Sequence, residues 1–256
     1  MNIAKQVILG KIKGENLLLQ KYGLRQHDLM SVEKKIEKID TSDLKALRRK
    51  LLPIEGRCSD FYFQQILSLF PASMQKTDKR RTFRAYDGLN NTFNFAYSLL
   101  KWKVHCSLIN AKLEPYLGFM HSMEPYKPSL VCDLMELYRH LVDAFLIQYG
   151  KEAQRRDFVV KTEKYVSSRQ GKREYLSDSK TNDLTKRFYA YLDWKVRISR
   201  IRHGEKSAIE TLISEESSLL AMYLRNEKKD WLPRVGITSQ LEIEINSKKP
   251  AAFYFS

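Results

Sequence analysis

Apolar residues recur every three or four positions along most of the chain, and this spacing predicts helices. The predicted helices cover residues 3–22, 29–39, 42–52, 54–70, 88–114, 130–150, 182–202 and 205–225. We expect Ser42 to cap the third helix and Pro53 to separate it from the fourth. Along the first helix, the lysines are expected to lie on the face opposite the apolar residues. Only 10 glycines and 7 prolines are present, which agrees with long regular elements.

Two segments alternate between apolar and polar residues, as strands do. Residues 158–176 mix β-branched and aromatic side chains around Gln170-Gly171, which predicts a short hairpin, and the tail over residues 237–256 alternates like an edge strand. The sequence therefore predicts a mainly α-helical domain over residues 1–233, followed by a C-terminal tail over residues 234–256.

Composition narrows the class of protein. Hydrophobic residues make up 43% of the chain, which is enough for a core, and every uncharged apolar run falls short of the ~18 residues that a membrane span needs. The first apolar run is broken by Lys5, Lys11 and Lys13, so we expect neither a secretory signal nor membrane insertion. The three cysteines, Cys58, Cys106 and Cys132, form no C-x-x-C pair. They are expected to be reduced, buried thiols of a cytoplasmic protein.

The formal net charge is +15, from 45 Lys and Arg against 30 Asp and Glu. It is +6 over residues 1–50, +2 over residues 51–150 and +7 over residues 151–234. Such an excess favours a phosphate backbone as partner, and a basic solvated surface is the alternative. Basic flanks around a less basic middle suit a nuclease, in which phosphates and a cation are held side by side.

Two basic clusters are candidates for DNA contact. The first combines Lys79, Arg80, Arg81 and Arg84 with the rings of Phe83 and Tyr86, and suits backbone contact with base stacking. The second, Lys195, Arg197, Arg200 and Arg202, is expected on a helix. A solvated charged surface explains the first cluster equally simply, and for the second cluster the sequence favours that explanation slightly.

Acidic residues gather on the predicted helix after Pro128. Asp133 and Glu136 lie at positions i and i+3 and share a face, which His140 and Asp143 extend by another turn. The ordinary interpretation is the solvated face of an amphipathic helix. The other interpretation is a divalent-cation site.

Two further residues bear on that choice. His121 lies just upstream, in a loop braced by Gly118, Pro125 and Pro128, and a histidine next to acids suits Mn²⁺ or Mg²⁺. Glu55 is expected in the first turn of a helix, where complementing the helix dipole would explain it without any site. Residue spacing alone leaves both interpretations open. His27, His105 and His203 show no acidic partner in the sequence pattern and are expected to be surface or core histidines.

Four blocks in a fixed order resemble a known family. They are "PIEGRCSDFYF", "YDGLNNTFNFAYSLL", "LEPYLGFMHS" and "PSLVCDLMELYR". Together they are similar to the integrase–endonuclease of CRISPR adaptation, the Cas-one family, and the similarity continues to about residue 233. The resemblance implies a helical catalytic lobe whose metal ligands are Glu55, His121 and Glu136. It also implies Asp133 as a supporting acid and Arg139 as a residue that either orients Glu136 or braces the helix.

The resemblance implies a chemistry and partners as well. Mg²⁺ or Mn²⁺ would serve DNA phosphodiester cleavage, or transfer of a 3′-OH end into a CRISPR repeat, and His121 could move a proton. The partners would be double-stranded DNA (repeat and incoming spacer), a small adaptation protein of the Cas-two family and a second copy of the chain. Lys127 and the cluster at residues 79–84 would bind DNA.

The sequence departs from the family in one respect, because members carry a β-rich N-terminal domain and this chain begins almost at the helical lobe. We therefore expect a truncated, split or specialised relative in which the dimer is in question. Two alternatives stay open. One is a basic DNA-binding or scaffold relative with impaired catalysis, and the other is a transposon-type integrase with the same site.

Overall fold

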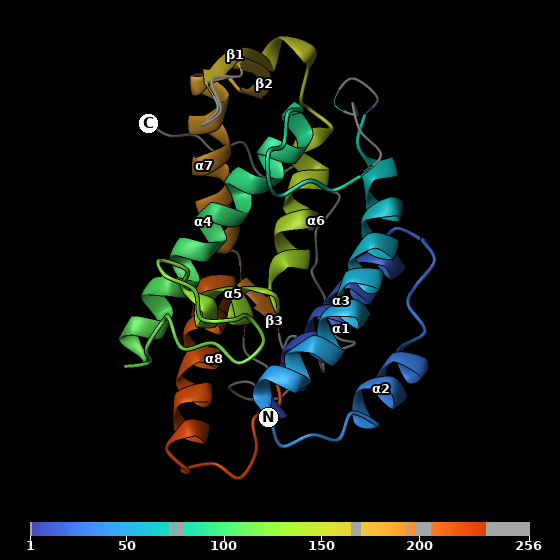
Figure 1. Cartoon of the computed structure of the whole chain (residues 1–256). Coiled ribbons are helices and arrows are strands. Elements are labelled where there is room, and N and C mark those ends of the chain that lie inside the picture. The colour runs from blue at the N-terminus through green and yellow to red at the C-terminus, as the bar shows by residue number, and fades with distance from the viewer. Residues whose placement is uncertain are drawn as a thin grey trace.

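The computed structural model of the protein describes residues 2–71, 74, 79–164, 170–193, 195–197 and 206–233. Within them the fold is mainly helical, which confirms the predicted class (Figure 1). The α-helices are α1 Asn2–Lys21, α2 Leu29–Glu37, α3 Leu44–Ile66, α4 Gly88–Asn110, α5 Ser129–Met135, α6 Arg139–Gly150, α7 Asp178–Leu192 and α8 Ile209–Leu224. Two short 3₁₀ turns, η1 Leu67–Leu69 and η2 Arg155–Asp157, follow α3 and α6.

Helix α6 occupies a central position, between α4 on one side and α1 with α3 on the other (Figure 1). The larger hydrophobic core gathers around it, with Phe93 of α4, Val142 of α6 and Phe188 of α7 almost completely buried. Each such side chain contributes roughly 1.5–3 kcal/mol by leaving water. A smaller core lies between α1, α2 and α3, and Met120 from the loop before α5 joins it. This contact places the loop that carries His121 against α1 and α3.

Helix α3 corrects the prediction of two helices separated by Pro53. It runs without interruption from Leu44 to Ile66, and Asp43 caps it in place of Ser42 through hydrogen bonds from the backbone N–H groups of Lys45 and Ala46. Pro53 is exposed, so water can satisfy the carbonyl that a backbone N–H at this position would have bonded. Glu55 consequently lies in the middle of a helix, where complementing the helix dipole no longer explains it.

The segment after Pro128 corrects a second prediction, since residues 130–150 form two helices. Between α5 and α6, the N–H groups of Glu136, Leu137 and Tyr138 bond to the carbonyls three residues earlier, at 3.3, 3.2 and 3.0 Å. This tight turn interrupts the α-helical spacing. Asp133, Glu136, His140 and Asp143 are all buried, so the interpretation of a solvated polar face is wrong.

Two antiparallel strand pairs complete the described fold. Strands β1 Phe158–Lys164 and β2 Gln170–Leu176 form the predicted hairpin, but Gln170 and Gly171 lie in β2 opposite Lys164 and Glu163. Strands β3 Lys195–Arg197 and β4 Lys206–Ala208 replace the ends of two predicted helices. Lys195 and Arg197 are therefore in a strand, while Arg200, Arg202, His203 and the strand-like tail lie outside the described residues.

No helix among the described residues combines the length and apolar character that crossing a lipid bilayer requires.

Candidate active site

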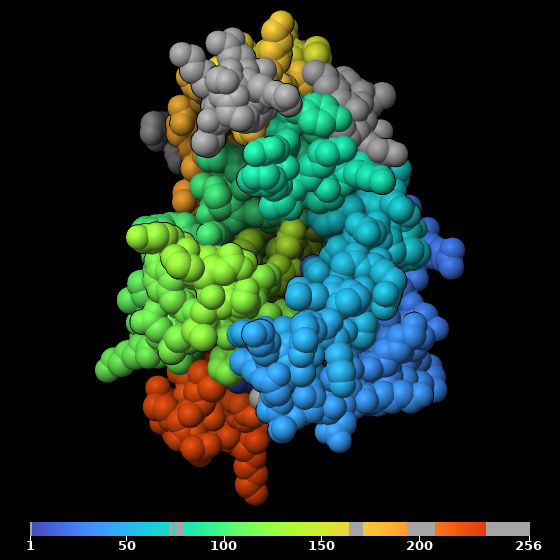
Figure 2. Space-filling view, in the orientation of Figure 1, coloured from blue at the N-terminus to red at the C-terminus, as the bar shows by residue number. Residues whose placement is uncertain are grey.

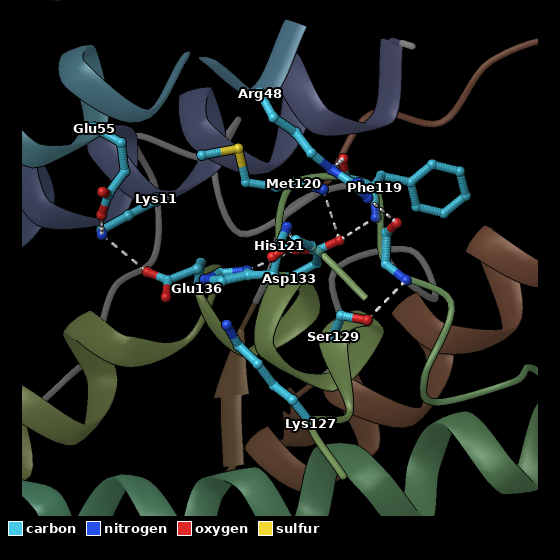
Figure 3. Close-up of polar contacts among 12 residues, drawn as sticks. Lys11, Arg48, Glu55, Phe119, Met120, His121, Lys127, Ser129, Asp133 and Glu136 are labelled. Atoms are coloured by element: carbon cyan, nitrogen blue, oxygen red, sulfur yellow. Dashed lines mark hydrogen bonds and ion pairs between the residues drawn. The ribbon is translucent and has the colours of Figure 1, made fainter. Parts of the chain in front are cut away.

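Asp133 of α5 holds the loop that carries His121 (Figure 3). Its buried carboxylate accepts hydrogen bonds from the backbone N–H groups of Phe119, Met120 and His121, the last two at 2.9 and 2.8 Å. The same carboxylate lies 2.7 Å from Nδ1 of His121. In the neutral ring, a carboxylate at this distance favours the proton on Nδ1, which leaves the lone pair on Nε2 as a possible ligand or base.

The loop is fixed from its other side as well. Arg48 of α3 donates from its guanidinium to the carbonyls of Gly118 and Phe119, at 2.6 and 2.8 Å. The N–H of Gly118 donates to Oγ of Ser129 at 3.2 Å. A Cβ at residue 118 would lie 2.7 Å from the backbone carbon of Ser129, so only glycine allows this approach. The position of His121 is therefore set by α3 and α5 together.

Glu136 follows α5 directly and is almost completely buried between two cations. Its Oε1 accepts from Arg139 at 2.8 Å, and its Oε2 lies 2.9 Å from Nζ of Lys11. Burial would raise the pKa of this carboxyl, but Arg139, Lys11 and His121 outweigh burial and lower it to about 2. Glu136 is therefore a carboxylate at any physiological pH.

Lys11 of α1 connects Glu136 to Glu55 of α3 (Figure 3). Its ammonium group makes a close ion pair with Oε1 of Glu55, to which Ser59 also donates at 3.0 Å. The Lys11 side chain is 4% exposed, against 25% for Glu55. Burial by itself lowers the pKa of Lys11. The negative charges of Glu136 and Glu55 raise it by more than burial lowers it, so the pKa lies above its ordinary value. One buried monovalent cation thus bridges carboxylates from two distant parts of the sequence.

Two glycines of α1 bring these groups together. Gly10 and Gly14 lie about one turn apart on either side of Lys11, and added Cβ atoms would meet Cδ2 of Leu137 at 2.5 Å and Nδ1 of His140 at 2.3 Å. Such distances are too short for any real side-chain contact. The absence of side chains at both positions therefore allows the turn with Glu136 to pack directly on α1.

The site remains open to solvent on one side. Figure 2 shows a hollow bordered by α3, by the loop before α5 (light green) and by residues 79–87 (turquoise), with α6 at its floor. The side chains of Glu55, His121 and Arg139 keep 25%, 27% and 21% of their exposure. These three side chains are therefore partly accessible to solvent.

The donor set fits a divalent cation on chemical grounds. Within the part of the chain that the structure describes, no three His, Cys, Asp or Glu side chains form a ready-made metal cluster. Instead, Glu55 and Glu136 already hold one cation, the Lys11 ammonium, and His121 faces Asp133. Two carboxylates and an imidazole are donors that Mn²⁺ and Mg²⁺ accept. Oε2 of Glu136 is paired with the Lys11 ammonium at 2.9 Å, so a metal ion could bond to this oxygen only in place of that group.

His140 and Asp143, expected on the same face, lie away from this donor set. Asp143 accepts hydrogen bonds from the hydroxyls of Tyr62, at 2.6 Å, and Tyr97. The guanidinium of Arg139 lies over the ring of Tyr97, 4.4 Å from its centroid. Asp143 therefore supports Arg139, which in turn orients Glu136, as the resemblance allowed. Sequence reasoning missed Lys11, Arg48 and the two tyrosines, because no local pattern connects them to the site.

The expected DNA-binding residues differ in their exposure and in their contacts with the protein. Lys79, Arg81 and Arg84 are exposed in the segment that borders the hollow, and Lys127 forms an ion pair with Glu124 at 3.0 Å. Arg80 is placed differently, because its guanidinium donates to Asn90 and Asn94, at 2.9 and 2.6 Å, and lies over the Phe93 ring. These partners hold the half-buried Arg80 side chain against α4.

The expectations for histidine and cysteine hold in part. His27 is a buried side chain, which was one of the two expected placements, but its Nε2 lies 3.0 Å from a carboxylate oxygen of Glu15 that the sequence pattern did not indicate. All three cysteines are free thiols, but only Cys58 is buried, and Cys106 and Cys132 are partly exposed.

Comparison with known proteins gives the same family that the sequence blocks resemble. CRISPR-associated endonuclease Cas1 of Korarchaeum cryptofilum is 27% identical over 166 residues, covering 58% of this chain and 49% of that protein. The chain spans about half the length of the curated relatives that it matches.

Two solved structures share the fold. A casposase bound to integration product superposes with a TM-score of 0.77 at 24% identity, over 94% of this chain and 65% of that one. A Cas6-RT-Cas1–Cas2 complex gives a TM-score of 0.71 at 20% identity, over 91% of this chain and 24% of that one. The family model described as CRISPR associated protein Cas1 matches residues 1–180, and the chain therefore belongs to the Cas1 family.

Proposed function

We propose that this protein is a metal-dependent DNA endonuclease and integrase that acts in CRISPR spacer acquisition. The observation that carries the proposal is the shared cation of Glu55 and Glu136, next to a histidine that Asp133 holds in one orientation. Family membership supports the same reaction class. A site that already holds a cation between two carboxylates is suited to holding a divalent one.

In this proposal Glu55, Glu136 and Nε2 of His121 hold Mg²⁺ or Mn²⁺. When bound, the metal ion would act as a Lewis acid on a phosphodiester and stabilise charge on the leaving 3′ oxygen. Asp133 would keep the proton of the neutral His121 ring on Nδ1, so that the lone pair is on Nε2. Arg139 keeps Glu136 charged and in place.

DNA is the proposed substrate, and either water or a 3′-OH end is the proposed nucleophile. The casposase with this fold is bound to an integration product, and the complex with this fold includes Cas2. We propose a Cas2-type protein as the partner on that basis, and a homodimer stays a prediction. Exposed Lys79, Arg81 and Arg84 would hold the phosphate backbone at the edge of the hollow.

The three proposed ligands can be tested one by one. Glu55→Gln, His121→Ala and Glu136→Gln are each expected to lower Mn²⁺- or Mg²⁺-dependent cleavage or strand transfer by at least about 100-fold, because each removes a metal bond. The measurement follows labelled branched and linear DNA on denaturing gels, with EDTA as the metal-free reference. Circular dichroism of each variant checks that the fold is kept.

Glu33→Gln provides a matched control. Glu33 also pairs with a lysine of α1, with its Oε1 2.8 Å from Nζ of Lys13, but the pair lies on the surface. This variant is expected to keep full activity. Wild-type activity in a folded ligand variant would remove that residue from the site. Salt-sensitive DNA binding without products at any metal concentration would favour the DNA-binding scaffold instead.

A further inference from the structure

Lys11 is a member of the site that no sequence pattern suggested. Its ammonium lies between Glu55 of α3 and Glu136 after α5, and the side chain is almost completely buried. Glycines on both sides of it allow the turn with Glu136 to approach α1. The surroundings therefore fix the backbone of Lys11 closely, while the position of its ammonium group depends on the torsions of a long, unbranched side chain.

We propose that Lys11 is a positioning residue that serves as a resident cation, holding Glu55 and Glu136 together until a divalent metal ion displaces its ammonium group. This inference rests on the proposed function, because it takes the same two carboxylates to be metal ligands. It adds that the chain itself supplies a cation, the Lys11 ammonium group, which competes with the metal ion for the two carboxylates.

The charges around Glu55 and Glu136 are the reason to expect this competition. Without Lys11, two carboxylates would face each other in a largely buried place, with Arg139 as a neighbouring cation of Glu136 alone, which is unfavourable. With a divalent ion on both carboxylates, an ammonium group at its present distance of 2.9 Å from Glu136 would face two extra positive charges at close range. The ammonium and the metal ion therefore compete, and Nζ of Lys11 must move away when the metal ion binds.

The test measures binding of Mn²⁺ alone, without DNA, to the full chain. Lys11→Met keeps an unbranched side chain and removes the charge, so we expect Mn²⁺ to bind about 10-fold more tightly by calorimetry. The same variant is expected to melt at a lower temperature without metal and to gain more from Mn²⁺ than the wild type does. Lys13→Met is the matched control, since it removes the same charge from a surface ion pair on the same helix.

A second measurement uses the wild-type protein and does not depend on the variant folding. A buried, ion-paired ammonium reacts slowly with an acylating reagent, so mass spectrometry is expected to show slow acetylation of Lys11 in EDTA. Adding Mn²⁺ should raise that rate several-fold and leave Lys13 unchanged.

The outcomes separate the two proposals. Unchanged or weaker Mn²⁺ binding in Lys11→Met would overturn the proposed displacement of Lys11. So would a rate of Lys11 acetylation that does not respond to Mn²⁺. In either case the metal site itself remains supported if Mn²⁺ binding by the wild type still depends on Glu136. If neither the wild type nor Lys11→Met binds Mn²⁺, the metal site itself is wrong.

Discussion

His140 is a buried histidine of α6, with its ring against Gly14 of α1. Neither ring nitrogen has a hydrogen-bond partner among the described residues. Burial therefore lowers the pKa of this imidazole to about 4. Between pH 6.5 and 4 the unfolded chain binds a proton that the folded protein resists. The stability contributed by the neutral ring is thus complete above pH 6.5 and disappears as the pH falls to 4.

His140→Leu is expected to remove this pH-dependent loss of stability, because leucine does not titrate. The lost contribution is on the order of 3 kcal/mol for the wild type over this range. Asp143, whose pKa burial raises to about 6, gives an opposite slope in both proteins, so their difference isolates His140. Urea unfolding at a series of pH values from neutral down to the lowered pKa measures it. Parallel pH profiles of the two proteins would show that His140 is not the titrating group.

For single residues, the sequence identified those site candidates that belong to short motifs. Glu55, His121, Asp133 and Glu136 were identified through the resemblance, and the structure brings the two glutamates onto one cation and the other two residues into direct contact. Lys11 was expected on the solvated face of its helix and is buried instead. Its role arises from two carboxylates that are distant along the chain, which no local pattern connects.

Among the elements, the packing of α1 against the turn after α5 depends on glycine. Gly14→Ala is expected to destabilise the protein by about 1–3 kcal/mol, because the new methyl group would overlap the His140 ring. Gly56→Ala is the matched control in α3, where nothing lies within 4 Å of the new Cβ. There the better helix propensity should stabilise by about 0.5–1 kcal/mol. Thermal unfolding compares the two, and equal effects would contradict the close approach at Gly14.

Helix positions followed from apolar spacing, but two features of the helices did not. Proline normally ends a helix, yet α3 passes through Pro53 because that residue lies on the exposed side. Conversely, the turn between α5 and α6 contains neither glycine nor proline, so no residue type marks it in the sequence, and both Glu136 and Leu137 contact α1 there. Strand β3 had a weak signal in the sequence, since "KVRIS" alternates as a strand does, but the longer helical pattern around it masked that signal.

For the whole molecule, the mainly helical class and the hairpin were predictable because both rest on local periodicity. The site was not, since α1, α3 and the α5 region meet only in the folded chain. The same holds for charge. The net charge of +15 predicted a nucleic-acid partner, but the fold decides which cations face outward, and it turns Arg80 inward while Arg81 stays exposed.

DNA binding by the whole molecule is therefore expected to depend on position as well as on charge. Replacing Lys79, Arg81 and Arg84 together by alanine should weaken binding and reduce the slope of log K against log salt by about 0.9 for each lost phosphate contact. The matched control replaces the exposed lysines at the end of α2, Lys34, Lys35 and Lys38, and removes the same charge. Fluorescence anisotropy at several salt concentrations gives both slopes. If both triple variants lose the same amount of DNA affinity, net charge alone governs binding and residues 79–84 make no specific DNA contact. If the variant of Lys79, Arg81 and Arg84 loses more affinity than the control, the duplex lies at the edge of the hollow.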